Sequence, residues 1–271
     1  MDGPTCCLVL RLAGPLQSWG RQSQFNRRET GTEPTKSGIV GLLAAAQGRR
    51  RTDPIEDLLD LRLGVRIDQP GSLLRDYHTV SDYRGGPLPS AAVNSRGVQK
   101  PTSPAKPTHV TERFYLQDAA FVAAVAGPPD VLATLRDAVR HPAFPLALGR
   151  RACVPTQPVF LPPGVDDEDP RHPGLWAGDL LPVLRQVAWQ VPPARAGQRR
   201  AGQAPPATVH LPVTLDDPEG DDTLFDLPTT FDPKTRSFAA RRVRHTWVPV
   251  RNPEGSDQAP DDHDPFALLD W

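Results

Sequence analysis

CCLVLRLAGP, residues 6–15, opens the chain with an apolar run that stops at a Gly-Pro pair. A short apolar run with β-branched content that ends at a turn signal predicts a buried β-strand. Small and aliphatic residues follow in KSGIVGLLAAA, residues 36–46, with Thr35 before them and Gly48 just after. Threonine suits a helix N-cap and glycine suits a C-terminal cap. The first two elements are therefore expected to be a strand and a closely packed helix.

The pattern continues through the first half of the chain. A second helix is expected from Asp53, with Pro54 in its first position. The expected later elements are the strands LGVRID (63–68), LLRDYHTV (73–80), TERFYL (111–116) and AAFVAAVAG (119–127), followed by the amphipathic helix VLATLRDAVR (131–140). Strand, helix, strand, strand, helix, strand is the ferredoxin-like order. The sequence thus predicts an α+β fold with a ferredoxin-like domain at residues 1–155.

Three parts of the chain lie outside that order. Residues 81–108 hold five prolines and three glycines with scattered Arg and Lys, so we expect an excursion that leaves one strand and returns in another. Residues 156–250 are proline-rich, with a possible helix at 178–189 and strand-like TVHLPVTL and SFAARRVRHTWVPV. We interpret them as a smaller β-rich C-terminal lobe. Residues 251–271 are expected to be an acidic, disordered tail.

The charge of the chain is divided along its length. The net charge is −1, but residues 1–51 carry a balance of +5, residues 75–113 carry +3 and residues 214–271 carry −7. A neutral protein with its basic charge in one half can bind a polyanion locally. Ordinary solvated surface charge is the alternative interpretation.

Apolar composition and cysteine spacing restrict the class of protein. No run of about 18 apolar residues and no secretory pattern is present, so a cytoplasmic protein with no membrane association is expected. Cys6, Cys7 and Cys153 have neither metal-ligand nor disulfide spacing. We expect them to be small buried hydrophobic residues.

Enzyme motifs are incomplete. GTEPTKS, residues 31–37, resembles a phosphate-binding loop, but Thr35 stands where glycine must precede the lysine. Lys36, Ser37 and the free amides of the helix N-terminus are expected to seat one backbone phosphate instead. The seven histidines show neither HExxH nor tight clustering with other ligands, so neither a metal nor a cofactor is expected.

One constellation could carry acid–base chemistry. Tyr77 and His78, with Arg75 and Lys36, could activate a ribose hydroxyl and stabilise a pentavalent phosphate. Neighbouring residues on a strand point to opposite faces, which disfavours cooperation between Tyr77 and His78. RNA contact or plain packing are the alternatives.

Two further features could contact a nucleic acid. Arg150 and Arg151 follow PLALG, and guanidinium groups suit bidentate phosphate binding. Surface solvation is the alternative. Trp19 lies in a polar loop and could either stack on a base or plug the edge of the core.

Six blocks between residues 8 and 153 resemble a known family. They are LVLRLAGPLQSWG (8–20), PTKSGIVGLLAAA (34–46), LRDYHTV (74–80), DYRG (82–85), TERFYLQDAAF (111–121) and LGRRAC (148–153). In this order they resemble the Cas-five family of the RAMP superfamily, in its type I-E CRISPR Cascade branch. Ala152 departs from the serine expected in the arginine-pair motif, and the resemblance is weak beyond Pro158.

This resemblance implies an RRM-related ferredoxin-like body with a protruding β-hairpin thumb, which matches the excursion at residues 81–108. It also implies a non-catalytic antiviral Cascade subunit that grips the 5′ handle of the CRISPR RNA and caps the backbone filament. The implied partners are the CasC backbone subunit, the CasA large subunit and, only through the assembled complex, target DNA.

Residues and resemblance together give the candidate RNA-binding set. It comprises Gln17, Trp19, Arg27, Arg28, Lys36, Ser37, Tyr77, His78, Arg84, Arg96, Lys100, Lys106, Arg150 and Arg151. The alternative function is a metal-independent endoribonuclease that processes CRISPR repeat RNA, as in type I-C relatives, with Tyr77, His78 and Lys36 as the catalytic candidates. A scaffold without RNA contact is the third interpretation, and it explains the basic excess around the family motifs poorly.

Overall fold

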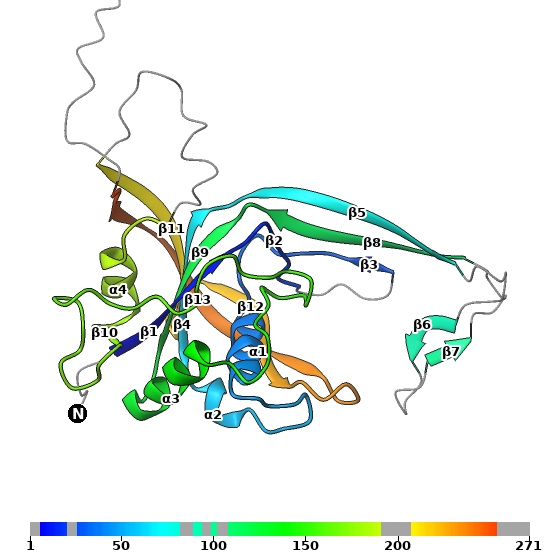
Figure 1. Cartoon of the computed structure of the whole chain (residues 1–271), viewed down its shortest axis with the longest axis horizontal. Helices are drawn as coiled ribbons and strands as arrows, with labels where there is room; N and C mark the ends of the chain where they lie inside the picture. The colour runs from blue at the N-terminus through cyan, green and yellow to red at the C-terminus, as the bar shows by residue number, and fades with distance from the viewer. Residues whose placement is uncertain are drawn as a thin grey trace, which may run out of the picture.

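The main element of the computed structural model is a seven-stranded antiparallel sheet in the order β10-β1-β9-β4-β11-β13-β12 (Figure 1). The structure describes residues 6–20, 26–81, 89–93, 99–101, 108–190 and 207–253. The strands are β1 (Cys6–Ala13), β4 (Arg62–Gln69), β9 (Ala120–Ala126), β10 (Trp176–Ala177), β11 (Thr208–Asp216), β12 (Asp222–Thr230) and β13 (Ser237–Arg251). Strands dominate, and the few helices cover the two faces of the sheet.

Both faces of the central strands are buried, because β1 and β9 carry apolar residues at successive positions. One face of β1, with Leu8 and Leu10, packs in the core that contains α1 (Lys36–Ala46) and α3 (Pro129–Arg140). The other face, with Val9, packs in the core that contains α4 (Leu180–Gln186). Near-continuous apolar runs are expected of strands covered on both sides.

The expected order of the first elements is present in the sheet. β1 and β4 flank β9 and are each antiparallel to it, so the chain passes from β1 through α1 to β4 and leaves a gap that β9 fills. The strand expected after α3 is reduced to β10 and a single bridge between Leu10 and Phe160. The segment between α3 and β10 is rich in proline, which cannot donate to a strand ladder.

The C-terminal strands are organised differently from the expected separate lobe. β11 pairs with β4 at Val213 and Arg66, and Leu211, Val213 and Leu215 share a core with Val9. The region is β-rich as expected, but its strands extend the first sheet, because the free edge of β4 and the alternating apolar residues of β11 complement each other.

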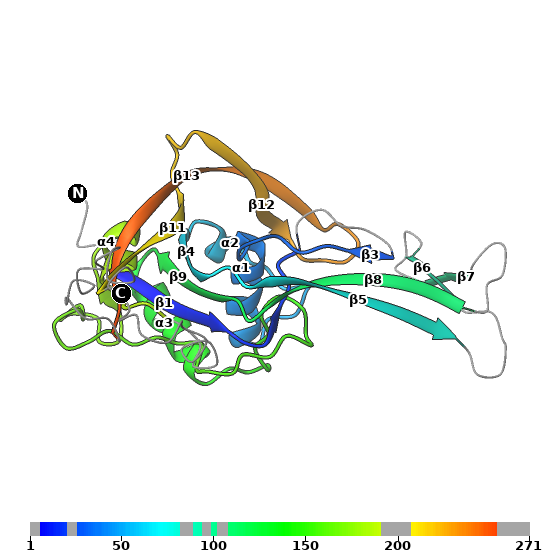
Figure 2. The same ribbon diagram turned by 90° about the horizontal axis from the view of Figure 1, so that it is seen from above.

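A second sheet projects from the body. It contains β2 (Leu16–Gln17), β3 (Arg27–Arg28), β5 (Ser72–Ser81) and β8 (Thr108–Gln117), with β5 and β8 paired from Ser72–Gln117 to Ser81–Thr108. Figures 1 and 2 show this hairpin extending away from the helices, with the short pair β6 (Pro89–Val93) and β7 (Gln99–Pro101) beyond it. The excursion therefore leaves β5 and returns in β8, as the sequence predicted.

The helix signals are confirmed at α1 and shifted at α2 (Glu56–Leu59). The Thr35 hydroxyl accepts a hydrogen bond from Gly38 N at 3.2 Å, and Gly48 has φ +79° after the helix end. The second helix begins three residues later than expected, because the Asp53 carboxylate accepts from Arg50 N at 2.7 Å and caps the preceding turn instead. Within the described ranges, no helix is both long and apolar enough to span a membrane.

Candidate nucleic-acid interface

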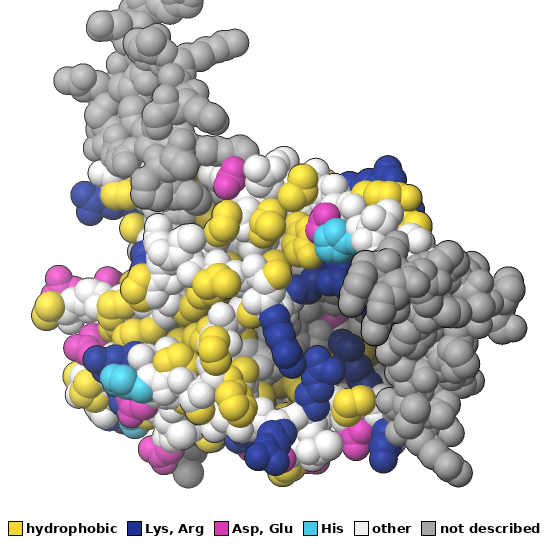
Figure 3. All heavy atoms as spheres, turned by 45° about the vertical axis from the view of Figure 1, so that its right-hand side comes forward, with side chains coloured by type: hydrophobic (Ala, Val, Ile, Leu, Met, Phe, Trp, Pro, Cys, Tyr) yellow, Lys and Arg dark blue, Asp and Glu magenta, His cyan; other side chains and the backbone are white. Residues whose placement is uncertain are grey.

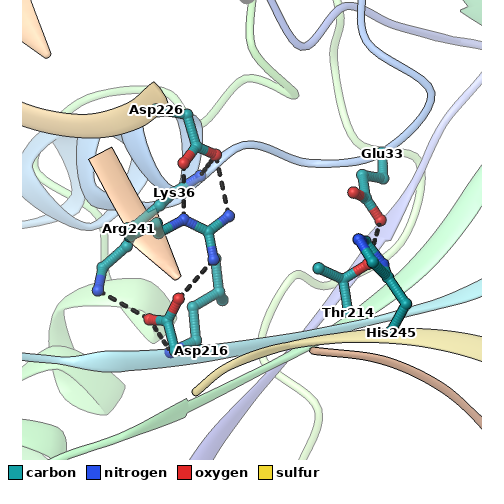
Figure 4. A network of polar contacts seen from close by, with 8 residues as sticks. Glu33, Lys36, Thr214, Asp216, Asp226, Arg241 and His245 are labelled. Carbon is teal, nitrogen blue, oxygen red and sulfur yellow. Dashed lines mark hydrogen bonds and ion pairs between the residues drawn. The ribbon is translucent and has the colours of Figure 1, made fainter. Parts of the chain in front are cut away.

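The N-terminus of α1 holds a buried charge network (Figure 4). Lys36 Nζ lies 2.8 Å from Asp216 Oδ2, and Lys36 N donates to Asp226 Oδ2 at 2.8 Å. Arg241 donates to both carboxylates, with Nε 2.6 Å from Asp226 Oδ1. A carboxylate at a helix N-terminus is favoured by the free amides and by the helix dipole. The seat that was expected to hold an RNA phosphate is therefore occupied by Asp226.

Burial and ion pairing shift the pKa of Arg241 in opposite directions. Burial alone lowers the pKa of Arg241, but hydrogen bonds and charges from Asp226 and Asp216 raise it above its usual value. Lys36 is only 7% exposed, and Ser37 is buried with its hydroxyl 3.2 Å from that of Thr35. Neither candidate is accessible to a phosphate in this conformation.

Gln17 and Trp19 lie in the core. Gln17 Nε2 donates to the carbonyls of Leu12 and Ala119, and its Oε1 accepts from Trp19 Nε1 at 3.1 Å. The indole packs so closely on α1 that a methyl group at Gly38 would lie 2.7 Å from it. Trp19 therefore fills the edge of the core in this structure, and its ring is not exposed for stacking on a base.

Arg150 forms hydrogen bonds with both β8 and β3. Its Nη1 donates to Phe114 O at 3.1 Å, its Nη2 donates to Arg28 O at 2.8 Å, and its guanidinium lies over Tyr115 at 4.8 Å. The preceding Gly149 has φ +88°, and a Cβ there would lie 1.9 Å from Ser18 O. Only glycine fits at that position. Arg151 is exposed, so the two members of the arginine pair have different environments.

The two faces of the β5–β8 hairpin carry different groups. Arg75 Nη2 lies 2.6 Å from Glu112 Oε1, and its guanidinium lies 5.8 Å from the centre of the Tyr77 ring. His78 Nε2 lies 2.7 Å from Asp76 Oδ2, and alternation along the strand places this pair on the opposite face from Tyr77. Tyr77 and His78 thus point apart, while Lys36 belongs to the buried network. The alternative catalytic set is not assembled.

Arginines from three separate segments act on one another electrostatically. The pKa of Arg236 is lowered by its partial burial and then by the positive charges of Arg51 and Arg28. We call Arg28, Arg51 and Arg236 the arginine triad. Arg113 is exposed and pairs in register with Arg28, and the exposed Arg27 lies over the Phe114 ring at 5.0 Å. Figure 3 shows Lys and Arg side chains gathered over a hollowed part of this face.

Like charges held together are stabilised by a bound polyanion. Sequence reasoning identified Arg27 and Arg28 but missed Arg51 and Arg236. The Arg49–Arg51 run was a usable signal for Arg51. Arg236 had none, because it lies in the acidic segment at residues 214–271, and only the folded chain lets the charges of Arg28 and Arg51 act on it.

Four other candidates belong to the excursion between β5 and β8. Arg84, Arg96 and Lys106 lie outside the described residues, and Lys100 lies in β7 without a described side chain. An open pocket of about 340 Å³ lies between residues 29–31 and residues 223–226. In the part of the chain that the structure describes, no group of three His, Cys, Asp or Glu side chains could hold a metal ion.

Comparisons with known proteins agree in their outcome. The family model of the CRISPR-associated protein Cas5 matches residues 7–244. The Cascade subunit CasD of Escherichia coli (strain K12) is 38% identical over 172 residues, which cover 57% of this chain and 69% of that protein. A chain of a solved CRISPR RNA-guided surveillance complex matches with a TM-score of 0.68 at 33% identity, covering 94% of this chain and 95% of the other.

A crystal structure of a Cas protein matches with a TM-score of 0.63 at 35% identity and covers 92% of this chain and 98% of the other. The resemblance inferred from the six sequence blocks is confirmed, and the matches extend through the C-terminal strands where that resemblance was weak. This chain belongs to the CRISPR-associated protein family Cas5.

Proposed function

We propose that this protein is a non-catalytic subunit of a CRISPR RNA-guided surveillance complex that binds the 5′ handle of the guide RNA and caps the backbone filament. The observation that carries the proposal is the near-complete match to a chain of such a complex, over 94% of this protein and 95% of the other. The arginine triad supplies a matching surface, because phosphate binding dominates the affinity of proteins for nucleic acids.

The projecting β5–β8 hairpin is the second part of the proposal. It extends from the body with exposed Tyr77, Val80 and Val110, and it adjoins β3, which carries Arg27 and Arg28. Exposed apolar positions beside cations suit a clasp that holds both bases and backbone of a single strand. The proposed thumb, which is the excursion at residues 81–108 that follows from this hairpin, would contact the guide RNA where this subunit meets CasC, while CasA and target DNA join in the assembled complex.

The non-catalytic assignment rests on the separation of the candidate groups. A general base must lie within hydrogen-bond reach of the proton that it removes. Lys36 forms its ion pair with Asp216, and His78 forms its ion pair with Asp76, so these two candidates do not act on one point. This geometry favours RNA binding over the endoribonuclease alternative.

Binding of a labelled handle RNA to the full chain tests the proposal at several salt concentrations. Arg51→Ala combined with Arg236→Ala should weaken binding and reduce the salt slope by about 0.7 per lost phosphate contact. Arg185→Ala on α4 is the matched control, because Arg185 is also exposed but lies on the helix that covers the other face of the sheet. Equal affinity and slope in all three proteins would contradict the proposal.

Incubation with labelled CRISPR repeat RNA, with and without a divalent metal, tests the alternative function. We expect no product. Cleavage that disappears in His78→Ala would reverse the assignment in favour of the endoribonuclease.

A further inference from the structure

Trp247 is 64% exposed, although it lies inside the 15-residue strand β13. It pairs in register with Pro212 of β11. Continued one residue beyond the last pair of the β11–β4 ladder, Val213 and Arg66, this register places Pro212 next to Ile67 of β4, which pairs with Phe121 of β9. An apolar row therefore crosses four strands on one face of the sheet, from the fully buried Phe121 to the solvent-exposed indole.

Three polar side chains and one proline lie next to the exposed end of this row. His245 and Pro249 lie two residues away along β13, a step of about 6.6 Å. His210 and Thr214 are the diagonal neighbours on β11, at roughly 7–8 Å between Cα atoms. His245 Nδ1 lies 3.0 Å from Thr214 Oγ1 and its Nε2 lies 3.2 Å from Asp222 Oδ2, so two contacts hold the imidazole in place.

The side chains on this surface indicate whether its partner is a nucleic-acid base or another protein. An aromatic ring attracts any base by stacking, and nearby cations and donors hold the backbone. His210, Pro249 and Arg251 are exposed on the same face as Trp247. A stable protein interface needs roughly 800 Å² on each partner, whereas one aromatic side chain supplies about 150–250 Å². A single stacked nucleotide needs no more than this.

The position of the row connects it to the arginine triad. Thr214 donates to Glu33 Oε2 at 2.9 Å, and Figure 4 shows Glu33 above Thr214 and His245. Glu33 belongs to the loop that runs from β3, where Arg28 lies, to the start of α1. The row therefore lies beside the segment that connects Arg28 to α1.

We propose that Trp247, backed by Pro212 and flanked by His210 and His245, stacks on one unpaired base of the guide RNA. The inference rests on the proposed RNA-binding function. It assigns a base contact to the C-terminal strands, and this contact is separate from the phosphate contacts of the triad.

The test compares Trp247→Ala, Trp247→Phe and the control Phe144→Ala in the full chain, with the same handle-containing RNA. Phe144 is 44% exposed in the loop after α3, so its removal deletes an exposed ring elsewhere. Trp247→Ala should lower the affinity about tenfold and leave the salt slope unchanged, because no phosphate contact is lost. Trp247→Phe should retain most of the affinity, since it keeps an aromatic face.

The outcomes separate this inference from the proposed function. If Trp247→Ala binds like Phe144→Ala while the Arg51 and Arg236 double variant binds weakly, the stacking inference is wrong and the RNA-binding function stands. If the double variant also binds normally, both are wrong. Normal RNA affinity with poor retention in the assembled complex during gel filtration would assign Trp247 to a protein contact and overturn the inference. Should thermal melting show that the alanine variant is unfolded, Trp247→Thr, which keeps β propensity, replaces it.

Discussion

The N-terminus of α1 and the arginine triad use basic residues in opposite ways. At α1, Lys36 and Arg241 lie against Asp216 and Asp226, all nearly buried. At the triad, the pKa of Arg236 is lowered by partial burial and by neighbouring cations. Two carboxylates, 180 and 190 residues away in the sequence, engage Lys36. At the triad, by contrast, the positive charges of Arg28 and Arg51 act on Arg236.

The largest expected effect is on the buried network. Asp216→Ala should lower the free energy of unfolding by about 3–5 kcal/mol, because removal of one partner leaves buried cations without compensation. Asp216 accepts from Lys36 Nζ, from Arg241 and from Leu63 N. Urea unfolding of the variant and of Asp57→Ala measures the difference.

Asp57 is the matched control, because it pairs with Arg49 but its side chain is half-exposed. Exposed ion pairs contribute little to stability. Equal destabilisation by the two substitutions would show that the α1 network is not a buried structural element, and the first half of the comparison would fail.

The second prediction separates Arg150 from Arg151. Arg150→Ala should cost about 1–3 kcal/mol of stability, because the carbonyls of Phe114 and Arg28 lose charged donors. It should also weaken RNA binding indirectly, since β3 carries Arg28 of the triad. Arg151→Ala should leave thermal melting unchanged. If both variants melt like the original protein and only the salt slope of RNA binding changes, Arg150 binds phosphate and does not hold β3.

The third prediction compares single cations in the two regions. Arg51→Met should reduce the salt slope of RNA binding by about 0.7, the value for one phosphate contact on a single strand. Lys36→Met should leave the slope unchanged, because Lys36 Nζ is engaged with Asp216. Both slopes are measured at a temperature where melting curves show the variants folded. A reduced slope for Lys36→Met would mean that the network opens when RNA binds.

Local patterns in the sequence predicted the elements near the motifs. The apolar run at Cys6–Ala13, the Thr35 cap and the strands on each side of the excursion are all present, because each depends on neighbours within a few residues. The pairing of β11 with β4 was missed, since the alternating pattern of TVHLPVTL predicts a strand but not its partner.

The candidate site shows the same division. The exposed Arg27 and Arg28 were found from composition, and the carboxylates that neutralise Lys36 were missed because they come from β11 and β12. Trp19 had two interpretations in sequence, and only its contact with Gly38 and Gln17 decides between them. Tertiary contacts over long separations therefore set which polar residues remain accessible.

The smallest expected effect concerns Arg49, which lies two residues before Arg51 and is paired. Its guanidinium donates to both Asp57 oxygens at 2.5 and 2.6 Å, and this hydrogen bonding holds the pKa of Asp57 below its usual value. A carboxyl with a lowered pKa in the folded state contributes stability above its unfolded pKa of about 3.9, and this contribution is lost as the pH falls through the folded pKa. Arg49→Gln should therefore be slightly less stable than the original protein at pH 6 and equally stable at low pH, when unfolding is followed across this range.

RNA binding of Arg49→Gln at neutral pH should keep its salt slope, because the guanidinium already has a carboxylate partner. A constant stability difference at every pH would show that Arg49 acts through packing, and a reduced slope would place it with Arg51 on the RNA-binding surface.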